Sequence, residues 1–283
     1  FGEQGVVSVR GAAESGLLEG TPILYRAGDQ PNNALSLNVF NPGEVAATGG
    51  TSGVVYAIRD SPEIHENTRV NHFAHVNYRK DQLQAIGTLL CINGAGIQYR
   101  WLLNNLAVGS YREMNQLASQ VAVGSDGVRL LPFGNGAERM LDNRNLGAHI
   151  LHLDLNRHSG AHLFRAALEG ISFSFVYGIE IMMSDGLSAS VIRAGNDNLF
   201  QSEIFARTLA TLIDKKIEVY NTTGAVGAAR ACILRDGDYE TFSAYTEHDL
   251  VQTYKPLQQK APYKEAYDHW KNELELILQK QIP

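Results

Sequence analysis

The chain has 283 residues and a mass of 31.0 kDa, a size that allows one large domain or two small ones. Hydrophobic residues make up 44% of the sequence and charged residues 19%, a globular composition that excludes wholesale disorder, collagen-like repeats and long coiled coils. The net charge of −6 and the pI near 5.9 argue against a general nucleic-acid binder, which would present a basic surface.

Short β-branched runs alternate with stretches of helical spacing along the chain. In order, we expect a strand at 6–10, a helix at 32–38, strands at 45–47 and 54–58, helices at 89–106 and 111–121, and a strand at 128–132. A helix at 161–183, a strand at 191–193, a helix at 200–213, a strand at 217–220, a helix at 224–234 and a last amphipathic helix at 263–277 follow. Residues 59–82 and 134–145 are expected to be loops, and 236–262 a polar surface linker. The alternation indicates an α/β architecture.

The helix expected at 161–183 has the strongest pattern in the chain. Its apolar positions step by three or four residues and form one stripe, which predicts a core helix: Phe164, Leu168, Ile171, Phe175, Ile179 and Met182. Arg165 and Glu169 lie one turn apart, and we expect them to form an ion pair rather than to take part in catalysis.

Cysteine usage and apolar runs bear on the compartment. Cys91 and Cys232 are far apart and form no C-x-x-C, so they can build neither a disulfide framework nor a thiolate zinc site. We expect a reducing, cytoplasmic location, no signal peptide and no membrane span, because Ser, Glu and Gly interrupt the apolar residues 170–183. The chain begins at Phe1 rather than Met, and we expect it to be part of a longer protein or a processed product.

Several familiar catalytic motifs are absent from the sequence. There is no P-loop, no nucleophile elbow and no G-x-G-x-x-G, since Gly94-Ala95-Gly96 lacks the third glycine. Histidines occur in three close pairs, His72 with His75, His149 with His152 and His158 with His162. None has the H-E-x-x-H form or an evident third ligand, so we expect no metal site from them.

Three glycine-centred turns each follow an apolar run: Gly28-Asp29-Gln30, Gly50-Thr51-Ser52-Gly53 and Gly195-Asn196-Asp197-Asn198. Each is compatible with an ordinary turn, because glycine permits unusual backbone angles and Asp, Asn, Thr and Ser form turn hydrogen bonds. The second turn joins two expected strands, and its backbone N–H groups could also form an anion-binding nest. The turns are therefore candidate phosphate or ligand sites, with structural turns as the alternative.

The order of these motifs resembles one protein family. The segments concerned are residues 16–23 with Ala27-Gly28-Asp29-Gln30, Gly50-Thr51-Ser52, residues 93–98, residues 147–170 with His158, Ala194-Gly195-Asn196-Asp197-Asn198, and residues 224–229. In this order they resemble the C-terminal part of the FGGY family of carbohydrate kinases, and xylulose kinases within it. Many members have Gly-Gly where this chain has Ala194-Gly195, and many xylulose kinases have Asp-Asn where it has Asp29-Gln30, a pair also seen in glycerol kinases.

The resemblance implies an actin-like, ribonuclease-H-like ATPase domain, a mixed sheet flanked by helices. Residues 1–40 would be a remnant of the N-terminal sugar-binding domain, and 41–283 the C-terminal ATP-binding domain. The implied reaction is ATP-dependent phosphorylation of a sugar hydroxyl, D-xylulose to xylulose 5-phosphate, with ATP and Mg²⁺. The missing N-terminal domain would carry most of the sugar pocket, so this chain alone is expected to be inactive.

Two alternatives stay open. One is another acceptor, namely ribulose, rhamnulose, gluconate or glycerol. The other is a non-catalytic nucleotide-binding module of the actin-like superfamily, which would have no need of a base facing an alcohol. A homodimer is one assembly open to the chain.

The resemblance also assigns roles to single residues. Asp29 would be the base that accepts the proton of the sugar hydroxyl, with an Asx-turn that caps the helix at 32–38 as its alternative. Gln30 would contact the sugar. Gly50, Thr51, Ser52, Gly94, Gln98, Gly195 and Asn198 would contact ATP. A buried helix contact is the alternative for Gly94 and Gln98, and an N-cap on the next helix is the alternative for Asn198. No metal ligand is assigned.

Overall fold

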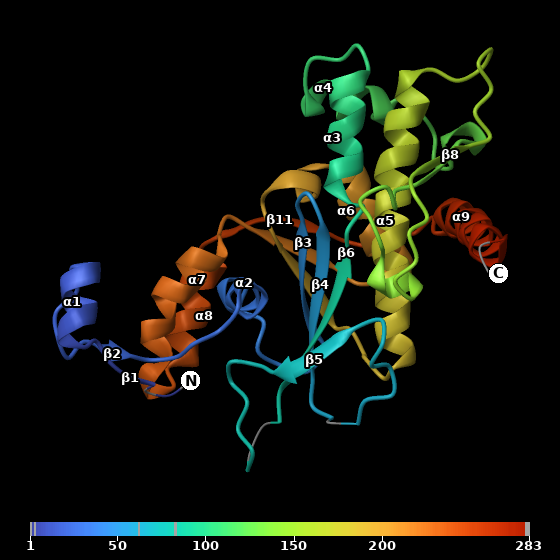
Figure 1. Ribbon diagram of the computed structural model, residues 1–283. Coiled ribbons are helices and arrows are strands. Elements are labelled where there is room, and N and C mark those ends of the chain that lie inside the picture. Colours follow the sequence, from blue (N-terminus) through green and yellow to red (C-terminus); the bar gives the residue numbers. More distant parts are fainter. Residues whose placement is uncertain (1, 3, 62, 82–83, 281–283) are drawn as a thin grey trace.

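A seven-stranded mixed sheet forms the centre of the computed structural model, which describes residues 2, 4–61, 63–81 and 84–280 (Figure 1). Its strand order is β11-β10-β9-β3-β4-β6-β5. Strand β9 pairs in parallel with β3 and β10, and the other neighbours pair antiparallel. The strands of this sheet are β3 (Glu44–Gly49), β4 (Gly53–Arg59), β5 (Asn71–Ala74), β6 (Ile86–Ile92), β9 (Val191–Gly195), β10 (Ile217–Tyr220) and β11 (Leu250–Tyr254).

Helices cover both faces of the sheet, as expected for the fold class. In chain order, the α-helices of the described residues are α1 (Val9–Ser15), α2 (Asp29–Ser36), α3 (Gly96–Asn105), α4 (Tyr111–Ser119), α5 (Gly160–Ser184), α6 (Glu203–Ile213), α7 (Gly224–Arg230), α8 (Tyr239–Glu247) and α9 (Ala261–Lys280). In Figure 1, α5 and α6 lie on one side of the sheet, and α2, α7 and α8 lie on the other. The side of the sheet that carries α5 and α6 will be called the α5 face, and the other the α2 face.

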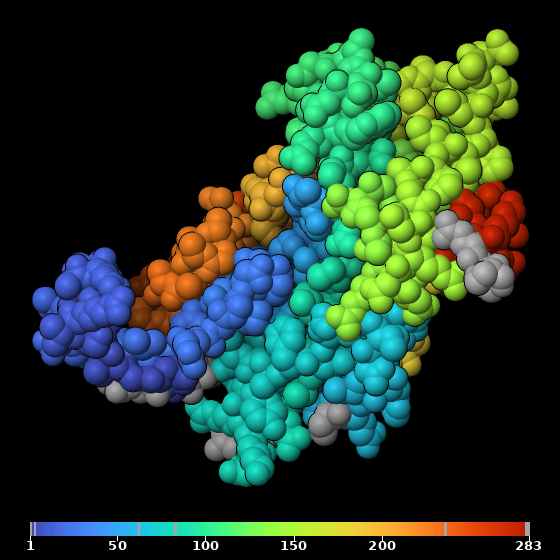
Figure 2. Space-filling view, in the orientation of Figure 1, coloured from blue at the N-terminus to red at the C-terminus, as the bar shows by residue number. Residues whose placement is uncertain are grey.

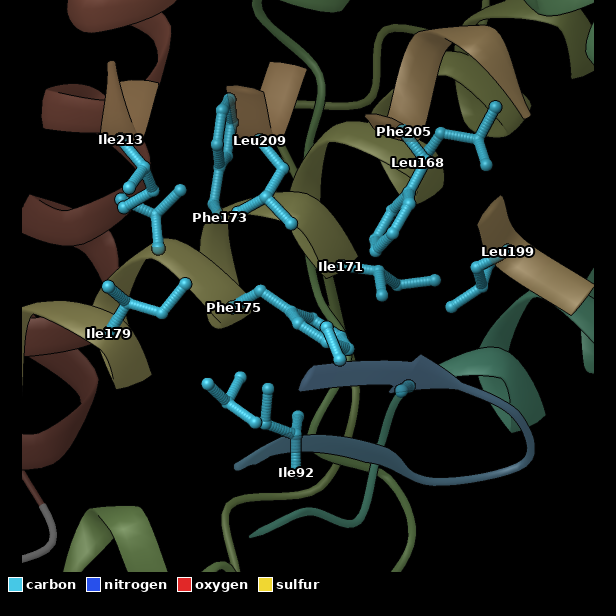
Figure 3. Packing of buried hydrophobic residues seen from close by; sticks show 14 of the residues in the cluster. Ile92, Leu168, Ile171, Phe173, Phe175, Ile179, Leu199, Phe205, Leu209 and Ile213 are labelled. Carbon is cyan, nitrogen blue, oxygen red and sulfur yellow. The ribbon is translucent and has the colours of Figure 1, made fainter. Parts of the chain in front are cut away.

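The core of the α5 face confirms the predicted stripe. All six stripe positions of α5 are buried. Figure 3 shows Leu168, Ile171, Phe175 and Ile179 among side chains of α6 and the sheet. By length and composition α5 could cross a membrane, contrary to the sequence expectation, but 83% of its most apolar window is buried inside the protein. Its apolarity is therefore explained by its place between the sheet and the surrounding helices.

Two glycines let α7 pack closely on α2 across the other face. A Cβ at Gly227 would lie 2.6 Å from the backbone nitrogen of Ser36, and one at Gly224 would lie 2.4 Å from Oδ1 of Asn33. The buried residues of α2 and of the segment that follows it share their apolar clusters with β3, β4 and α8. Residues 29–40 thus pack within the same body as the later elements, and the division of the chain near residue 40 stays a prediction.

The first residues form an arm that stands apart from this body (Figures 1 and 2). The arm consists of β1 (Gly5–Val6), α1 and β2 (Pro22–Ile23), with β1 and β2 paired antiparallel. Helix α1 has no buried residue. Large apolar side chains on the arm are exposed: Val6, Val9, Leu17, Leu18 and Ile23. The strand predicted at 6–10 is wrong beyond Val6, because Ser8 caps α1 by accepting a hydrogen bond from the Gly11 amide.

Four further expectations need correction. Residues 89–92 belong to β6, and the helix begins only at Gly96. The loop expected at 59–82, of which residues 62 and 82 lie outside the described residues, contains β5. The linker expected at 236–262 contains α8 and β11. The helix expected at 200–213 is preceded by the short helix η3 (Asn198–Gln201), and α6 starts at Glu203. Two short strands outside the main sheet, β7 (Arg129–Leu131) and β8 (His149–Leu151), pair with each other.

Candidate functional site

The sheet register brings most of the predicted turns to one edge. Gly49 pairs with Gly53, which also pairs with Ile92 at the end of β6. Strand β3 runs parallel to β9, and Tyr220 at the end of β10 pairs with Gly195 at the end of β9. The hairpin turn at 50–52, the segment at 93–96 and the turn at 195–198 therefore follow neighbouring strand ends. Ligands of open α/β sheets bind at such an edge.

A cavity of about 1050 Å³ opens beside this edge on the α5 face. Gly50 and Thr51 line it from the hairpin, and Asn198 lines it from the start of η3. Arginines contribute to its walls from four helices, α3, α4, α5 and α6: Arg100, Arg112, Arg165 and Arg207. Glu203 is the acidic residue among the described lining residues. Arg165 is paired with Glu169, as expected from the sequence, and Arg207 is paired with Glu203. Arg100 and Arg112 form no ion pair within the described residues, and their charge favours an anionic ligand.

The hairpin turn is fixed by the start of α3. The amide of Gly96 donates to Gly50 O at 3.1 Å, and the amide of Ile97 donates to Thr51 O at 3.0 Å. In a planar trans peptide the N–H points opposite to the C=O, so the N–H groups of Thr51 and Ser52 point away from α3. Within the described part of the chain, neither N–H donates to a protein acceptor. Two adjacent N–H groups are therefore available to an anion, as a phosphate-binding turn requires.

Gly94 and Gln98 do not line the cavity, although both flank its wall. The amide of Gly94 donates to Oε1 of Glu138 at 2.8 Å, and a Cβ at Gly94 would lie 1.8 Å from Pro132 O. Gln98 is buried in α3. These surroundings match the buried-contact alternative, and a role for either residue in ATP binding stays a prediction.

Asn198 lines the cavity, whereas Gly195, the last residue of β9, does not. Asn198 has a φ of 47°, in the left-handed region that Asn tolerates better than most residues. The N-cap alternative for Asn198 is wrong, because Ser202 caps α6 and its hydroxyl accepts a hydrogen bond from the Phe205 amide. The side chain of Asn198 is thus left at the cavity wall.

Asp29 is the first residue of α2 and is exposed. Gly28 is the N-cap of this helix, so Asp29 lies within its first turn rather than in a capping Asx-turn. Oδ1 of Asp29 accepts from the Gln30 amide at 2.9 Å, and Oδ2 accepts from Gln30 Nε2 at 3.3 Å. The predicted base and the predicted sugar contact are therefore neighbours in space, and a carboxylate in the first helical turn suits the helix dipole.

Asp29 faces a second cavity, of about 650 Å³, on the α2 face. Gln30, Arg26, Phe73 and His75 also line it. Burial raises the pKa of the Cys91 thiol, and the negative charge of Asp29 adds to that rise. Cys91 directly precedes Ile92, the residue that pairs with Gly53. Asp29 therefore acts electrostatically on Cys91, one residue before the strand end that pairs with Gly53.

The sequence patterns missed several residues of this site. Tyr99 and Tyr111 stack with ring centroids 5.8 Å apart in the wall of the first cavity. Arg100 and Arg207 line the same cavity. No local motif marks these residues, since α3, α4 and α6 are brought together only by the fold. Among the described residues there is no group of three or more His, Cys, Asp or Glu that could hold a metal ion.

Comparison with known proteins gives one family. Residues 45–234 match the C-terminal domain of the FGGY family of carbohydrate kinases. The chain is 26% identical over 274 residues to a xylulose kinase of Haemophilus influenzae, covering 94% of this chain and 53% of that protein. It is 25% identical over 250 residues to a gluconokinase of Bacillus subtilis, covering 83% of this chain and 47% of that protein.

The solved structures give the same fold. A xylulose kinase from Rhodospirillum rubrum superposes with a TM-score of 0.85 at 21% identity, over 98% of this chain and 56% of that one. The chain thus spans about half the length of the relatives it matches. The actin-like architecture expected from the motifs is confirmed.

Proposed function

The chain belongs to the FGGY family of carbohydrate kinases, and on that premise we propose that it forms the ATP-binding half of an enzyme that phosphorylates a sugar hydroxyl. The observation that carries this proposal is the hairpin at the sheet edge, whose two outward N–H groups lie beside a cavity lined with arginines. The exposed carboxylate of Asp29 lines a second cavity. The nucleotide would occupy the first cavity, and the acceptor sugar would occupy the second.

Each residue near the edge then has a chemical task. The N–H groups of Thr51 and Ser52 would hold the transferring phosphate, and Asn198 would contact the nucleoside. Asp29 would accept the proton of the sugar hydroxyl while its oxygen attacks phosphorus. Its carboxylate accepts hydrogen bonds only from Gln30 within the described residues, so it is accessible to an alcohol. Mg²⁺ would arrive on the ATP phosphates, since it is usually held by phosphates and one or two carboxylates.

The proposed acceptor is D-xylulose, because relatives named as xylulose kinases match over most of this chain. A second acceptor, gluconate, is favoured by Arg26, which lines the same cavity as Asp29 and could pair with a carboxylate. The exposed apolar side chains of the arm suit a partner domain that would supply the rest of the sugar pocket.

The nucleotide part of the proposal is tested on this chain by calorimetric titration with Mg-ATP, ADP and adenosine. We expect binding of all three and little or no sugar phosphorylation by the chain alone. Robust turnover of xylulose by this chain would contradict the assignment of half an enzyme, and failure to bind any of the three would contradict the proposed nucleotide site.

The transfer step is tested with Asp29→Asn in the longer protein that joins this sequence to a sugar-binding domain. Loss of a general base typically lowers kcat by about 10²- to 10⁴-fold. The affinity for Mg-ATP should stay unchanged, because Asp29 lies outside the first cavity. Asp268→Asn, on the exposed side of α9, is the matched control and should retain full activity. Unchanged turnover of Asp29→Asn would remove Asp29 from the mechanism.

The acceptor is identified by measuring phosphorylation of xylulose, ribulose, gluconate and glycerol by the same longer protein.

A further inference from the structure

Glu138 is a fully buried acid that lies outside both cavities, with 0% of its surface exposed. Its carboxylate accepts two backbone hydrogen bonds, from the Asn93 amide at 2.9 Å and from the Gly94 amide at 2.8 Å. Among the described residues it forms no ion pair. A charge buried without a cation is costly unless hydrogen bonds satisfy it. The donors that offset this cost both belong to the segment that joins β6 to α3.

This segment is held from several sides at once. Asn93 Nδ2 donates to Ala137 O at 2.6 Å, and Asn135 Nδ2 donates to Asn93 O at 2.9 Å. Gly94 lies so close to Pro132 O that no side chain fits there. We name this arrangement the clasp: Asn93 and Gly94 on one segment, Asn135 and Glu138 on the other. Burial raises the pKa of the Glu138 carboxyl, and the two amides act against that rise.

The clasp lies directly before the residues that fix the phosphate hairpin. Gly96 and Ile97 follow it by two and three residues, and their amides hold the carbonyls of Gly50 and Thr51. A Cβ at Gly96 would lie 2.3 Å from Gly50 O, so the start of α3 and the hairpin touch through backbone atoms. A shift of the clasp would therefore change the direction of the Thr51 and Ser52 N–H groups.

We propose that Glu138 is a positioning residue for the phosphate-binding hairpin, acting through the start of α3. The inference rests on the proposed function, since it takes the hairpin as the site of the ATP phosphates. It goes further by assigning phosphate recognition to a carboxylate that touches neither the nucleotide cavity nor the hairpin.

The test compares Glu138→Gln with wild-type chain. Gln keeps the shape of Glu, but its NH₂ group faces one of the two amides and leaves that donor unsatisfied. We expect the affinities for Mg-ATP and ADP to fall by about 10-fold or more, the size of one lost buried hydrogen bond. The affinity for adenosine should change less than about 2-fold, because adenosine does not reach the hairpin. Equal losses for adenosine and ATP, or an unchanged affinity for ATP, would overturn the proposal.

Asp185→Asn is a control for the loss of a buried carboxylate. Asp185 also accepts two backbone amides, from His65 at 2.8 Å and Glu66 at 2.9 Å, but it is paired with Arg59 as well and lies beyond the end of α5. Loss of the Asp185 carboxylate should lower stability but should not lower the affinity for Mg-ATP more than the affinity for adenosine. If Asp185→Asn weakened Mg-ATP binding selectively, as much as Glu138→Gln does, a specific role of Glu138 would be contradicted.

Hydrogen exchange of the nucleotide-free chain supplies a second readout. We expect the Gly96 and Ile97 amides to exchange about 10-fold faster in Glu138→Gln and at the wild-type rate in Asp185→Asn. Unchanged exchange in Glu138→Gln overturns the positioning role. If the wild-type chain binds no nucleotide, the proposed function fails. Faster exchange confined to Glu138→Gln would still support the link from Glu138 to the start of α3.

Discussion

His75 is a buried histidine whose ring lies between the sheet and the segment after α2. Its Nε2–H donates to Val39 O at 3.1 Å, and its Nδ1 accepts from the Tyr56 hydroxyl at 2.8 Å. The carbonyl can only accept, so Nε2 carries a proton, and in the neutral ring Nδ1 is then the acceptor. Burial lowers the pKa of His75 to about 4, against the carbonyl hydrogen bond that raises it. The sequence paired His75 with His72 as a loop histidine, and only the fold gives it these partners.

The lowered pKa predicts a dependence of stability on pH. The unfolded chain, with an ordinary histidine pKa of about 6.5, binds the proton more readily than the folded chain. The contribution of neutral His75 to the free energy of unfolding is therefore constant above about pH 6.5 and is lost as the pH falls toward 4. The free energy of unfolding should fall by about 3 kcal/mol over this range.

The measurement is urea unfolding of wild type and His75→Gln at several pH values between 4 and 7. Gln can donate to Val39 O and accept from Tyr56 without titrating in this range. As the pH falls from 7 to 4, we expect the free energy of unfolding to decrease more for wild type than for His75→Gln. Parallel curves for both proteins would contradict the assignment to His75.

The sequence locates the turns that form the site, but it does not reveal the residues that hold those turns in place. Gly50, Thr51 and Asn198 stand in local patterns with a chemical meaning, and all three line the cavity. Glu138 binds amides 44 and 45 residues away, and no spacing in the sequence marks that contact. Asn198 was open to an N-cap role that Ser202 takes instead, because η3 separates Asn198 from α6.

Helices α2 and α7 pack closely because α7 has a glycine where the two helices meet. At Gly227 the nearest atoms are the backbone N and Cα and the Cβ of Ser36, which cannot rotate away. We therefore expect Gly227→Ala to lower the free energy of unfolding by about 1–3 kcal/mol, the usual cost of overpacking. Equilibrium unfolding in urea measures this change.

Gly11→Ala is the control for that substitution. Gly11 lies inside α1, and the nearest atoms to its added Cβ are side-chain atoms at 3.4 Å. This variant should be neutral or slightly stabilising, because alanine is the better helix former. A neutral Gly227→Ala, or an equally destabilised Gly11→Ala, would show that the close contact of α2 and α7 does not limit stability.

Elements with strong periodicity were predictable, and elements placed by the fold were not. The predicted helix at 161–183 corresponds to α5, and the predicted strand at 217–220 coincides with β10, because both have a clear apolar pattern. Strand β11 is half-exposed at the sheet edge, and α8 buries only Phe242 and Thr246. Such elements bury too little apolar surface to mark a face in the sequence, so the sequence predicts a linker at 236–262.

At the scale of the whole molecule, α9 closes the α5 face of the core. Trp270 is 1% exposed, donates through Nε1 to Leu130 O at 2.9 Å and contacts the rings of Phe133 and Phe173. We expect Trp270→Ala to lower the free energy of unfolding by about 3–5 kcal/mol. Trp270→Phe should lose less, since it keeps most of the ring volume and gives up one hydrogen bond.

Thermal and urea unfolding of the two Trp270 variants measure this difference. Below the unfolding transition, both variants should bind ADP like wild type, because Trp270 does not line the first cavity. Equal destabilisation by Ala and Phe would assign the effect to the hydrogen bond alone and would contradict a role in packing.

The glycines of α7 have a consequence for how the chain could work. Asp29 is the first residue of α2, and α2 packs against α7 at Gly227, which faces the Ser36 backbone, and at Gly224, which faces the Asn33 side chain. α7 in turn follows β10, whose last residue ends beside Gly195. Asp29 and the turn at 195–198 are therefore joined through packed elements of one body. Under the proposed function, their alignment would be set when the chain folds, and the acceptor alcohol would have to come to the carboxylate.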